Sequence, residues 1–382
     1  MPTVPHCPHL PPCPGCPRFG ALDAAPPAIA QLSDFCVKHG AQWEVRVGAR
    51  HGFRQRARLA VRGRRGAPKI GIFEQGSHRV VDIPGCVIHH PLINVVARAL
   101  KATMREQGAT CYSDTAHAGL VRALQVVIER GTQTAQVVIV CNGDTPEHAR
   151  PLLDAFAARL GSVLHSLWWN GNPERTNVIL GPHFWQHSGR ELVEEQLGGA
   201  RVFFPPAAFG QNNLDLFESM LEQIRSLVPP GRDVVELYAG CGAIGLGLVQ
   251  RSRSVLFNEI GSASLAGLAR GIEALGPVHG ARVRVVAGSA EAAATAIGPG
   301  SVVIVDPPRK GLEAPLLASL AASTPDQLVY VSCGLTSFLR DAAELIGAGL
   351  RLQSATAYDL FPYTDHVETL AAFRRCGPGE AA

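Results

Sequence analysis

The sequence lacks any run of about 18 apolar residues, so we expect no membrane-spanning helix. Its amino terminus has no basic stretch followed by an apolar one, which excludes a typical secretory signal and favours a cytoplasmic location. Charged residues are only 18% of the 382 residues, and hydrophobic residues are 46%, which indicates two or three folded domains. Because the net charge is only +3, a polyanion would have to contact a local basic patch.

Ten cysteines are present, and without an export signal we do not expect them to form a disulfide framework. Three of them, Cys7, Cys13 and Cys16, lie among prolines that prevent a helix or a strand. Thiolates that converge on a metal would order such a segment, and both zinc and an iron–sulfur cluster suit thiolates. The spacing differs from the three-cysteine pattern of radical enzymes. A fourth ligand must come from elsewhere: Cys86 is our first choice, and the other candidates are Cys36, His6 and His9.

Residues 38–69 are basic, with ten Lys or Arg against a single acid, Glu44. Within them, Arg54, Arg56 and Arg58 alternate with less polar residues, and this period of two predicts a strand with three guanidiniums on one face. Such a face suits the phosphates of a nucleic acid. The alternative is a solvated sheet edge that charge protects from pairing with other chains.

The two halves of the chain have different patterns. Residues 118–169 predict an α+β region, with strands over 119–128, 134–141 and 163–169 and a helix that begins at Thr145-Pro146 and ends at Gly161. From about residue 230, strands alternate with helices, which predicts a parallel sheet covered on both faces. The strands are expected at 234–238, 254–258, 282–287, 302–305, 328–332, 350–357 and 367–373, and helices at 244–249 and 262–272.

A glycine-rich turn, Gly240-Cys-Gly242-Ala-Ile-Gly245, follows the first of these strands, and Glu259 ends the next one. The glycines allow the backbone to approach a ligand closely, and the acid can accept hydrogen bonds from ribose hydroxyls. The pattern predicts an adenosine-type cofactor; NAD and S-adenosylmethionine both fit. We find no set of residues suited to hydride transfer, which an NAD-dependent oxidoreductase would need.

Two further motifs follow strands at the same expected edge of the sheet. Asp306-Pro-Pro-Arg-Lys-Gly311 places a carboxylate on a rigid turn, and Ser332-Cys333-Gly334 places a thiol beside it. A thiol at such a rim is a candidate nucleophile, although a lone cysteine is more often buried for packing. Glu368 begins the last strand; a lone glutamate of this kind usually lies at the surface.

Five motifs in this order resemble the RNA 5-methyluridine methyltransferases, which act on ribosomal and transfer RNA with S-adenosylmethionine. They are Phe209-Gly-Gln-Asn-Asn213, Glu236-Leu-Tyr-Ala-Gly-Cys-Gly242, Asp306-Pro-Pro-Arg-Lys-Gly311, Ser332-Cys-Gly334 and His366-Val-Glu368. The resemblance covers nearly the whole chain. Its cysteines resemble the ligand set of the ribosomal RNA branch, which contains a [4Fe-4S] cluster.

The resemblance implies a C-terminal Rossmann-like methyltransferase domain over residues 201–382, with a mostly parallel sheet. An α+β RNA-recognition domain over 21–200 and a cysteine segment over 1–20 would precede it, leaving no room for the extra N-terminal β-barrel of some relatives. Cys333 would be the nucleophile that adds to uracil C6, and Glu368 would remove the C5 proton. The methyl donor would contact Gln211, Tyr238, Gly240, Gly242, Glu259 and Asp306, and the cluster ligands would be Cys7, Cys13, Cys16 and Cys86.

RNA would be the partner of a monomeric enzyme, contacted through Arg54, Arg56 and Arg58. We expect ribosomal RNA; transfer RNA and a non-catalytic RNA-binding role are the alternatives. Three positions depart from the family pattern. Gly334 stands where Asn usually follows the nucleophile, and Gly210 stands where the family's Phe-Phe-Gln-x-Asn motif has its second Phe. Ser289 stands where an acid follows the third strand, with Glu291 nearby.

Overall fold

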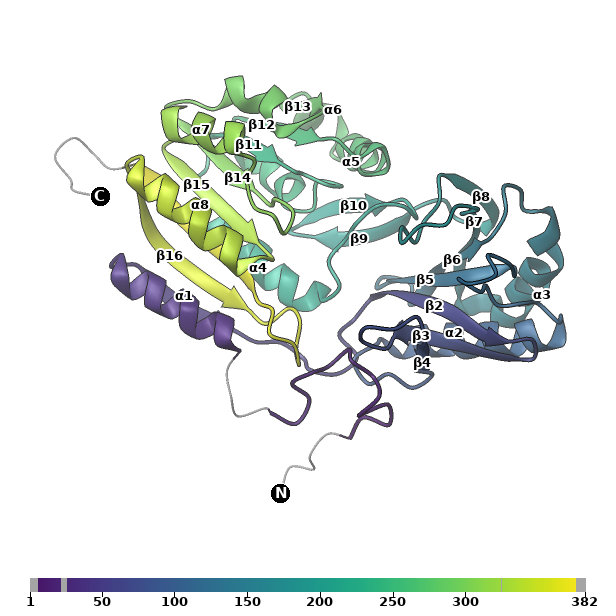
Figure 1. The fold of residues 1–382 in the computed structure, drawn as a ribbon. Helices are drawn as coiled ribbons and strands as arrows, with labels where there is room; N and C mark the ends of the chain where they lie inside the picture. Colours follow the sequence, from purple (N-terminus) through teal and green to yellow (C-terminus); the bar gives the residue numbers. More distant parts are fainter. Residues whose placement is uncertain (1–5, 22–25, 324, 376–382) are drawn as a thin grey trace. The chain divides into compact units, whose positions relative to one another are not determined.

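The computed structural model describes residues 6–21, 26–323 and 325–375 (Figure 1). They form two compact units. The first comprises the described residues of Met1–Gly20, Ala49–Glu195 and Pro205–Ala207. The second comprises those of Ala21–Gly48, Gln196–Phe204 and Ala208–Ala382. The long apolar helix that a membrane span requires is not found among these residues.

An eight-stranded sheet forms the centre of the second unit, in the order β1-β16-β17-β15-β14-β11-β12-β13. Its strands are β1 (Gln42–Arg46), β11 (Asp233–Leu237), β12 (Ser254–Glu259), β13 (Val283–Ala287), β14 (Ser301–Val305), β15 (Gln327–Ser332), β16 (Leu350–Tyr358) and β17 (Glu368–Arg375). Strands β11 to β15 are parallel to one another, and β17 is antiparallel to both β15 and β16. The expected mostly parallel α/β sheet is therefore confirmed, with β17 as its antiparallel member.

Helices cover both faces of this sheet because its central strands are apolar throughout. On one face α1 (Pro27–Lys38), α7 (Ala314–Ser323) and α8 (Leu335–Gly347) share a core with the sheet (Figure 1). In helix α4 (Leu214–Leu227), the side-chain amide of Gln223 donates a hydrogen bond to the Thr356 hydroxyl of β16. The remaining helices are α5 (Ser262–Ala274), α6 (Gly276–Gly280), and the 3-10 segments η3 (Gly245–Arg251) and η4 (Ala290–Ala296). The helix expected at 244–249 is thus a 3-10 segment, in which Gly245 approaches Glu236 too closely for a side chain.

A seven-stranded sheet, in the order β4-β3-β2-β5-β6-β7-β8, forms the first unit. Its strands are β2 (Arg56–Arg64), β3 (Ala67–Phe73), β4 (Val80–Asp82), β5 (Val121–Glu129), β6 (Thr134–Cys141), β7 (Leu164–Gly171) and β8 (His183–Gly189). Helices α2 (Pro91–Glu106) and α3 (Arg150–Leu160) pack against one face around a single apolar core. Short 3-10 segments, η1 (Glu147–Ala149) and η2 (Gly161–Val163), flank α3, and the expected strands and helix in this region are confirmed.

Residues 21–48 differ from the division expected from sequence, since they lie in the second unit. The reason is strand pairing: β1 adds in parallel to β16, with Trp43 opposite Ala355, and α1 packs on the same sheet. The chain passes between the units within β9 (Val193–Leu197), which pairs with β10 (Ala200–Phe204).

Candidate active site

The strand order of the eight-stranded sheet reverses at β11, which lies between β12 and β14. At this point Leu237 pairs with both Asn258 and Val305. The next residue on each strand, respectively Tyr238, Glu259 and Asp306, therefore reaches the carboxyl edge at the same level. Ligands of open α/β sheets bind at such a reversal.

The glycine turn after β11 is built around Glu259. Its Oε2 accepts from the Gly240 amide at 2.7 Å, and its Oε1 accepts from the amides of Ile260 and Gly261 at 2.8 and 2.6 Å. Gly240 has φ +56° and open space where a Cβ would lie, whereas a Cβ on Gly242 would come within 2.6 Å of Leu268. Gly240 thus allows the turn, and Gly242 allows close helix packing.

Strand pairing brings Cys333 and Glu368 together, although 35 positions separate them in the chain. Ser332 of β15 is opposite Thr369 of the antiparallel β17, so one step further along the ladder Cys333 faces Glu368. The electrostatic interactions agree, since the Cys333 thiol interacts with Glu368, Asp306 and Arg309. A nucleophile, two carboxyls and a cation therefore meet at one edge of the sheet.

Burial decides the protonation of these groups. Glu368 is 1% exposed with neither carboxyl oxygen hydrogen-bonded, and burial, reinforced by Asp306, raises its pKa well above the ordinary value. Burial likewise raises the pKa of Asp306. Burial raises the pKa of the Cys333 thiol, the two carboxyls raise it further, and Arg309 lowers it. The resting site therefore favours a protonated Cys333 thiol and a protonated Glu368.

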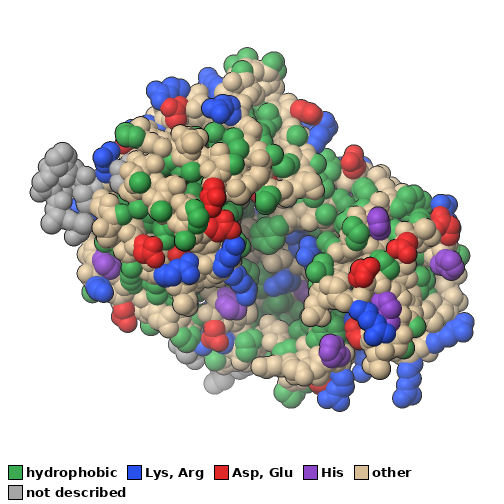
Figure 2. Space-filling view, turned by 45° about the horizontal axis from the view of Figure 1, so that its top comes forward, with side chains coloured by type: hydrophobic (Ala, Val, Ile, Leu, Met, Phe, Trp, Pro, Cys, Tyr) green, Lys and Arg blue, Asp and Glu red, His purple; other side chains and the backbone are tan. Residues whose placement is uncertain are grey.

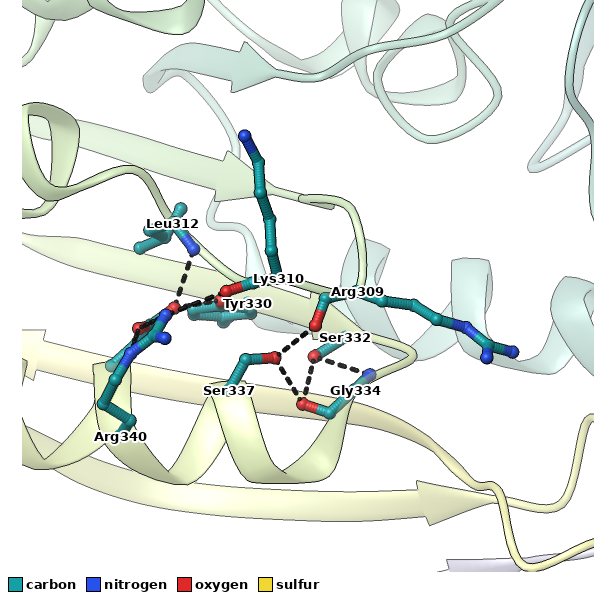
Figure 3. Close-up of polar contacts among 9 residues, drawn as sticks. Arg309, Lys310, Leu312, Tyr330, Ser332, Gly334, Ser337 and Arg340 are labelled. Carbon is teal, nitrogen blue, oxygen red and sulfur yellow. Dashed lines mark hydrogen bonds and ion pairs between the residues drawn. The ribbon is translucent and has the colours of Figure 1, made fainter. Parts of the chain in front are cut away.

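Helix α8 holds the two loops of the site in place (Figure 3). The Ser337 hydroxyl lies 2.8 Å from both the Arg309 and the Gly334 carbonyl oxygens. The buried carboxylate of Asp341 accepts from Tyr330 Oη and from the Leu312 amide, each at 2.8 Å. The side chains of Arg309 and Lys310 leave this loop in different directions, and that of Arg309 extends away from α8 (Figure 3).

Three residues at this edge were not selected from the sequence. Arg309 was quoted only as part of a motif, and Ile260, 73% exposed, is an apolar side chain directly after Glu259. Glu236 is 2% exposed, and burial, with Asp306 and Glu259 adding to it, raises its pKa well above normal. Among the predicted donor-site residues, Gln211 is buried, whereas Phe209, two positions earlier, is exposed. Burial raises the pKa of the Tyr238 hydroxyl to about 12. The exposed apolar residues could have been found only by knowing which positions the fold covers.

The structure brings the thiols of four predicted ligands into electrostatic contact in the first unit. Burial raises the pKa of Cys16 to about 12, and Cys86, Cys13 and Cys7 all add to that shift. No disulfide joins any of the cysteines in the described ranges. Across those ranges, no three His, Cys, Asp or Glu side chains are arranged to hold a metal ion. Of the other candidates, Cys36 is buried in the core of the second unit, and His9 Nε2 accepts from the Gly85 amide at 3.2 Å.

The three predicted arginines have different surroundings. Arg54 is largely buried, and its guanidinium interacts with the Cys86 and Cys16 thiols. Arg56 interacts with the charge of Glu195, and Arg58 donates to Gln125 Oε1 at 2.7 Å. Lys and Arg side chains are spread among acidic ones over the face seen in Figure 2. A polyanion would therefore have to contact local groups, as expected from the low net charge.

Comparisons with known proteins agree with this geometry. Residues 299–375 match the family model described as tRNA (Uracil-5-)-methyltransferase. The chain is 36% identical over 334 residues to an RNA methyltransferase of Protochlamydia amoebophila, covering 86% of this chain and 87% of that one. It is 31% identical over 340 residues to an RNA methyltransferase of Gloeobacter violaceus, and this match covers 85% of this chain and 70% of that one.

Among solved structures, the chain is similar to the tRNA (uracil-54, C5)-methyltransferase of Pyrococcus abyssi in complex with S-adenosyl-L-homocysteine. The TM-score is 0.73 at 24% identity, and the match covers 89% of this chain and 81% of that one. At this identity the similarity supports the fold, an α/β arrangement that in the Pyrococcus protein binds the demethylated methyl donor.

Proposed function

The chain belongs to the RNA uracil-5-methyltransferase family, and on that premise we propose that it methylates C5 of a uridine in RNA through a covalent cysteine adduct. Family membership and fold make it an RNA methyltransferase that uses S-adenosylmethionine. The observation that carries the finer proposal is the meeting of Cys333, Glu368 and Asp306 at the carboxyl edge of the sheet.

The chemistry needs one nucleophile and one base, because uracil C5 is itself a poor nucleophile. The Cys333 thiol loses its proton to solvent, and its sulfur bonds to C6, which moves electron density onto C5. C5 would then bond to the methyl carbon as the bond from that carbon to the donor sulfur breaks, and S-adenosylhomocysteine would leave. Glu368 accepts the C5 proton, so that the C5=C6 double bond re-forms as the S–C6 bond breaks. The target base must leave its stack to reach these groups.

The carboxyl edge suits an adenosine-type methyl donor. Glu259 is oriented by three backbone amides at the place where ribose hydroxyls would bind, and Ile260 offers an exposed apolar surface for the adenine. Gln211, Tyr238, Gly240, Gly242 and Asp306 would complete the site. S-adenosylmethionine supplies the electrophilic methyl group and a sulfonium charge. Asp306 and Glu368 would lose their protons more readily beside such a cation.

The decisive experiment compares Cys333→Ala with Glu368→Gln. We expect no methyl transfer from the first variant. With Glu368→Gln, a protein–RNA adduct stable to denaturing gel electrophoresis should accumulate, because elimination needs the C5 proton to be removed. The double variant is the control and should form no adduct. A Cys333→Ala enzyme that still methylates uridine C5 would contradict the mechanism.

The RNA substrate has two candidates. The resemblance of the cysteine segment to the ribosomal RNA branch favours ribosomal RNA, which we propose. Transfer RNA is favoured by the description of the matching family model and by the substrate named for the Pyrococcus protein. Methylation assays with unmodified ribosomal and transfer RNA transcripts, followed by mass spectrometry of the product nucleosides, distinguish the two.

We further propose that Cys7, Cys13, Cys16 and Cys86 hold a [4Fe-4S] cluster. Its support is the mutual electrostatic interaction of these four thiols, of which Cys13 and Cys16 are buried. A four-iron cluster binds each thiolate to a different iron and so keeps the sulfurs further apart than a single ion does. Zinc, which also binds thiolates, is the alternative. Its role would be to order the proline-rich segment.

A further inference from the structure

We propose that a pocket on the seven-stranded sheet binds one unpaired nucleotide of the RNA substrate, apart from the uridine that is methylated. This inference rests on the proposed function in taking RNA as the ligand. The pocket has a volume of about 520 Å³, within the roughly 300–1,000 Å³ of small-ligand sites. Among its lining residues are Arg58, Arg62, Phe73, His78, Val178 and Ile179. We call it the sheet pocket.

The sheet pocket opens on the face opposite helices α2 and α3. Along β2, Ala57, Leu59 and Val61 are buried, all three in the core beneath those helices. The alternate residues Arg58, Ala60 and Arg62 project from the other face and line the pocket. An open sheet face with stacking side chains is a surface on which RNA bases bind.

Three apolar side chains at the pocket remain exposed to solvent. Phe73 is 40% exposed, Val178 is 64% exposed and Ile179 is 42% exposed. Exposed apolar side chains scattered singly are ordinary, but a cluster at the mouth of a cavity marks a binding site. Phe73 lies on β3, whereas Val178 and Ile179 lie on the loop between β7 and β8, so two separate elements supply the cluster.

The loop that exposes Val178 and Ile179 is held in place by side chains. Asn172 Nδ2 donates to the carbonyl oxygens of Val178 and Ile179, at 2.8 and 3.1 Å. Arg122 in turn donates to the carbonyl oxygens of Asn172 and Glu174, at 2.5 and 2.7 Å. The exposure is therefore built into the loop, and little ordering is needed when a ligand binds.

The charged part of the pocket combines three arginines, Arg58, Arg62 and Arg122, with two acids, Glu74 and Asp114. Two hydrogen bonds to Asp114, of 2.7 and 2.9 Å, fix the Arg62 guanidinium, whose Cζ lies 5.2 Å from the Phe73 ring centroid and 5.0 Å from that of Tyr112. Arg58 uses its Nε for Gln125, and its terminal nitrogens can meet a phosphate. A flat apolar slot beside a guanidinium matches the base and the phosphate of a nucleotide.

Cross-linking of the full-length protein tests the assignment. The probe is a 12-nucleotide oligouridylate that contains 4-thiouridine, and photo-cross-linked peptides are identified by mass spectrometry. We expect cross-links to the peptides that contain Phe73 and Ile179. Phe73→Ala should weaken binding of the probe on the order of tenfold, because base stacking is lost, and Phe73→Trp should restore it. Arg58→Gln should weaken binding and lower the salt dependence by about one phosphate contact.

Trp43→Ala is the matched control, because Trp43 is an aromatic side chain exposed to a similar degree, 41%, in the second unit. It should bind the probe as the wild type does. An enzyme that methylates RNA but gives no cross-link in either peptide overturns the sheet pocket alone. Cross-links in both peptides without methyl transfer overturn the proposed function alone. A 12-base-pair RNA duplex that competes as well as the single strand would also contradict an unpaired nucleotide.

Discussion

Arg309 lowers the pKa of the Cys333 thiol, whereas the two carboxyl groups beside the thiol raise it. Burial, Glu368 and Asp306 keep the sulfur protonated, and the guanidinium favours the thiolate. A cysteine nucleophile attacks as its thiolate, so the cation determines how much of the enzyme is ready to react at a given pH.

Replacing Arg309 should therefore change a pH profile. In Arg309→Gln the thiol pKa rises further, so kcat/KM should reach its plateau at a higher pH and fall at neutral pH. The rate of Cys333 alkylation by iodoacetamide, measured against pH, checks this without RNA. Lys310→Gln is the control, since Lys310 pairs with Glu313 at 2.8 Å. Equal shifts in both variants would contradict a specific role for Arg309.

Glu368 should make the protein less stable as the pH rises. Its folded-state pKa is raised, so above the ordinary glutamate pKa the unfolded chain releases a proton that the folded chain keeps, and stability falls. Glu368→Gln removes this dependence. We expect its melting temperature, relative to wild type, to be higher at pH 8 than at pH 5, as measured by calorimetry. A difference independent of pH would mean that Glu368 is ionised in the folded protein.

Among the elements, α8 couples the two loops that carry the reacting groups. Its first turn begins one residue after Gly334, and Ser337 on that turn hydrogen-bonds to both loops. The loop with Arg309 and the turn with Cys333 therefore keep a constant separation. Gly311 allows this packing, since its φ is +84° and a Cβ there would lie 2.5 Å from Asp341 Oδ2.

Ser337→Ala should loosen this coupling. The single hydroxyl proton is shared between two carbonyl oxygens, so about one hydrogen bond is lost, and we expect the free energy of unfolding to fall by about 0.5–1.5 kcal/mol. Because the loops carry the chemistry, kcat should fall while KM for S-adenosylmethionine changes little. Thr336→Ala, at the exposed neighbouring position, is the control for both measurements. A rise in that KM with unchanged kcat would assign Ser337 to donor binding instead.

The elements also show how far sequence patterns reach. Apolar runs predicted the central strands of the second unit to within one or two residues, because a strand buried on both faces must be apolar throughout. The 3-10 segment after β11 was wrongly expected to be a helix, because the close approach of Gly245 to Glu236 is a tertiary contact. Strand β1 pairs with β16, although most of the chain lies between them in sequence, and no local sequence pattern indicates this pairing.

On the scale of the whole molecule, residues 6–21 contain turns but no helix or strand, so a cluster bound by their thiols would be what orders them. We predict that protein purified without oxygen contains about four iron atoms per chain, measured by elemental analysis together with sulfide. Cys16→Ala should lose this iron and lower the melting temperature. Cys36→Ala should keep the iron, because Cys36 belongs to the other core. Stoichiometric zinc in place of iron would contradict the cluster.

The sequence by itself determined the family and predicted the donor-binding turn and the reacting groups, because motifs that follow strands keep their chemistry and their order. Only the tertiary structure decided which of these groups meet. The antiparallel insertion of β17 beside β15 brings Glu368 to Cys333, and period-two alternation alone could not tell that Arg54 turns toward thiols while Arg58 lines a pocket. Strand pairing and burial join residues that are distant in the chain, and no local pattern contains that information.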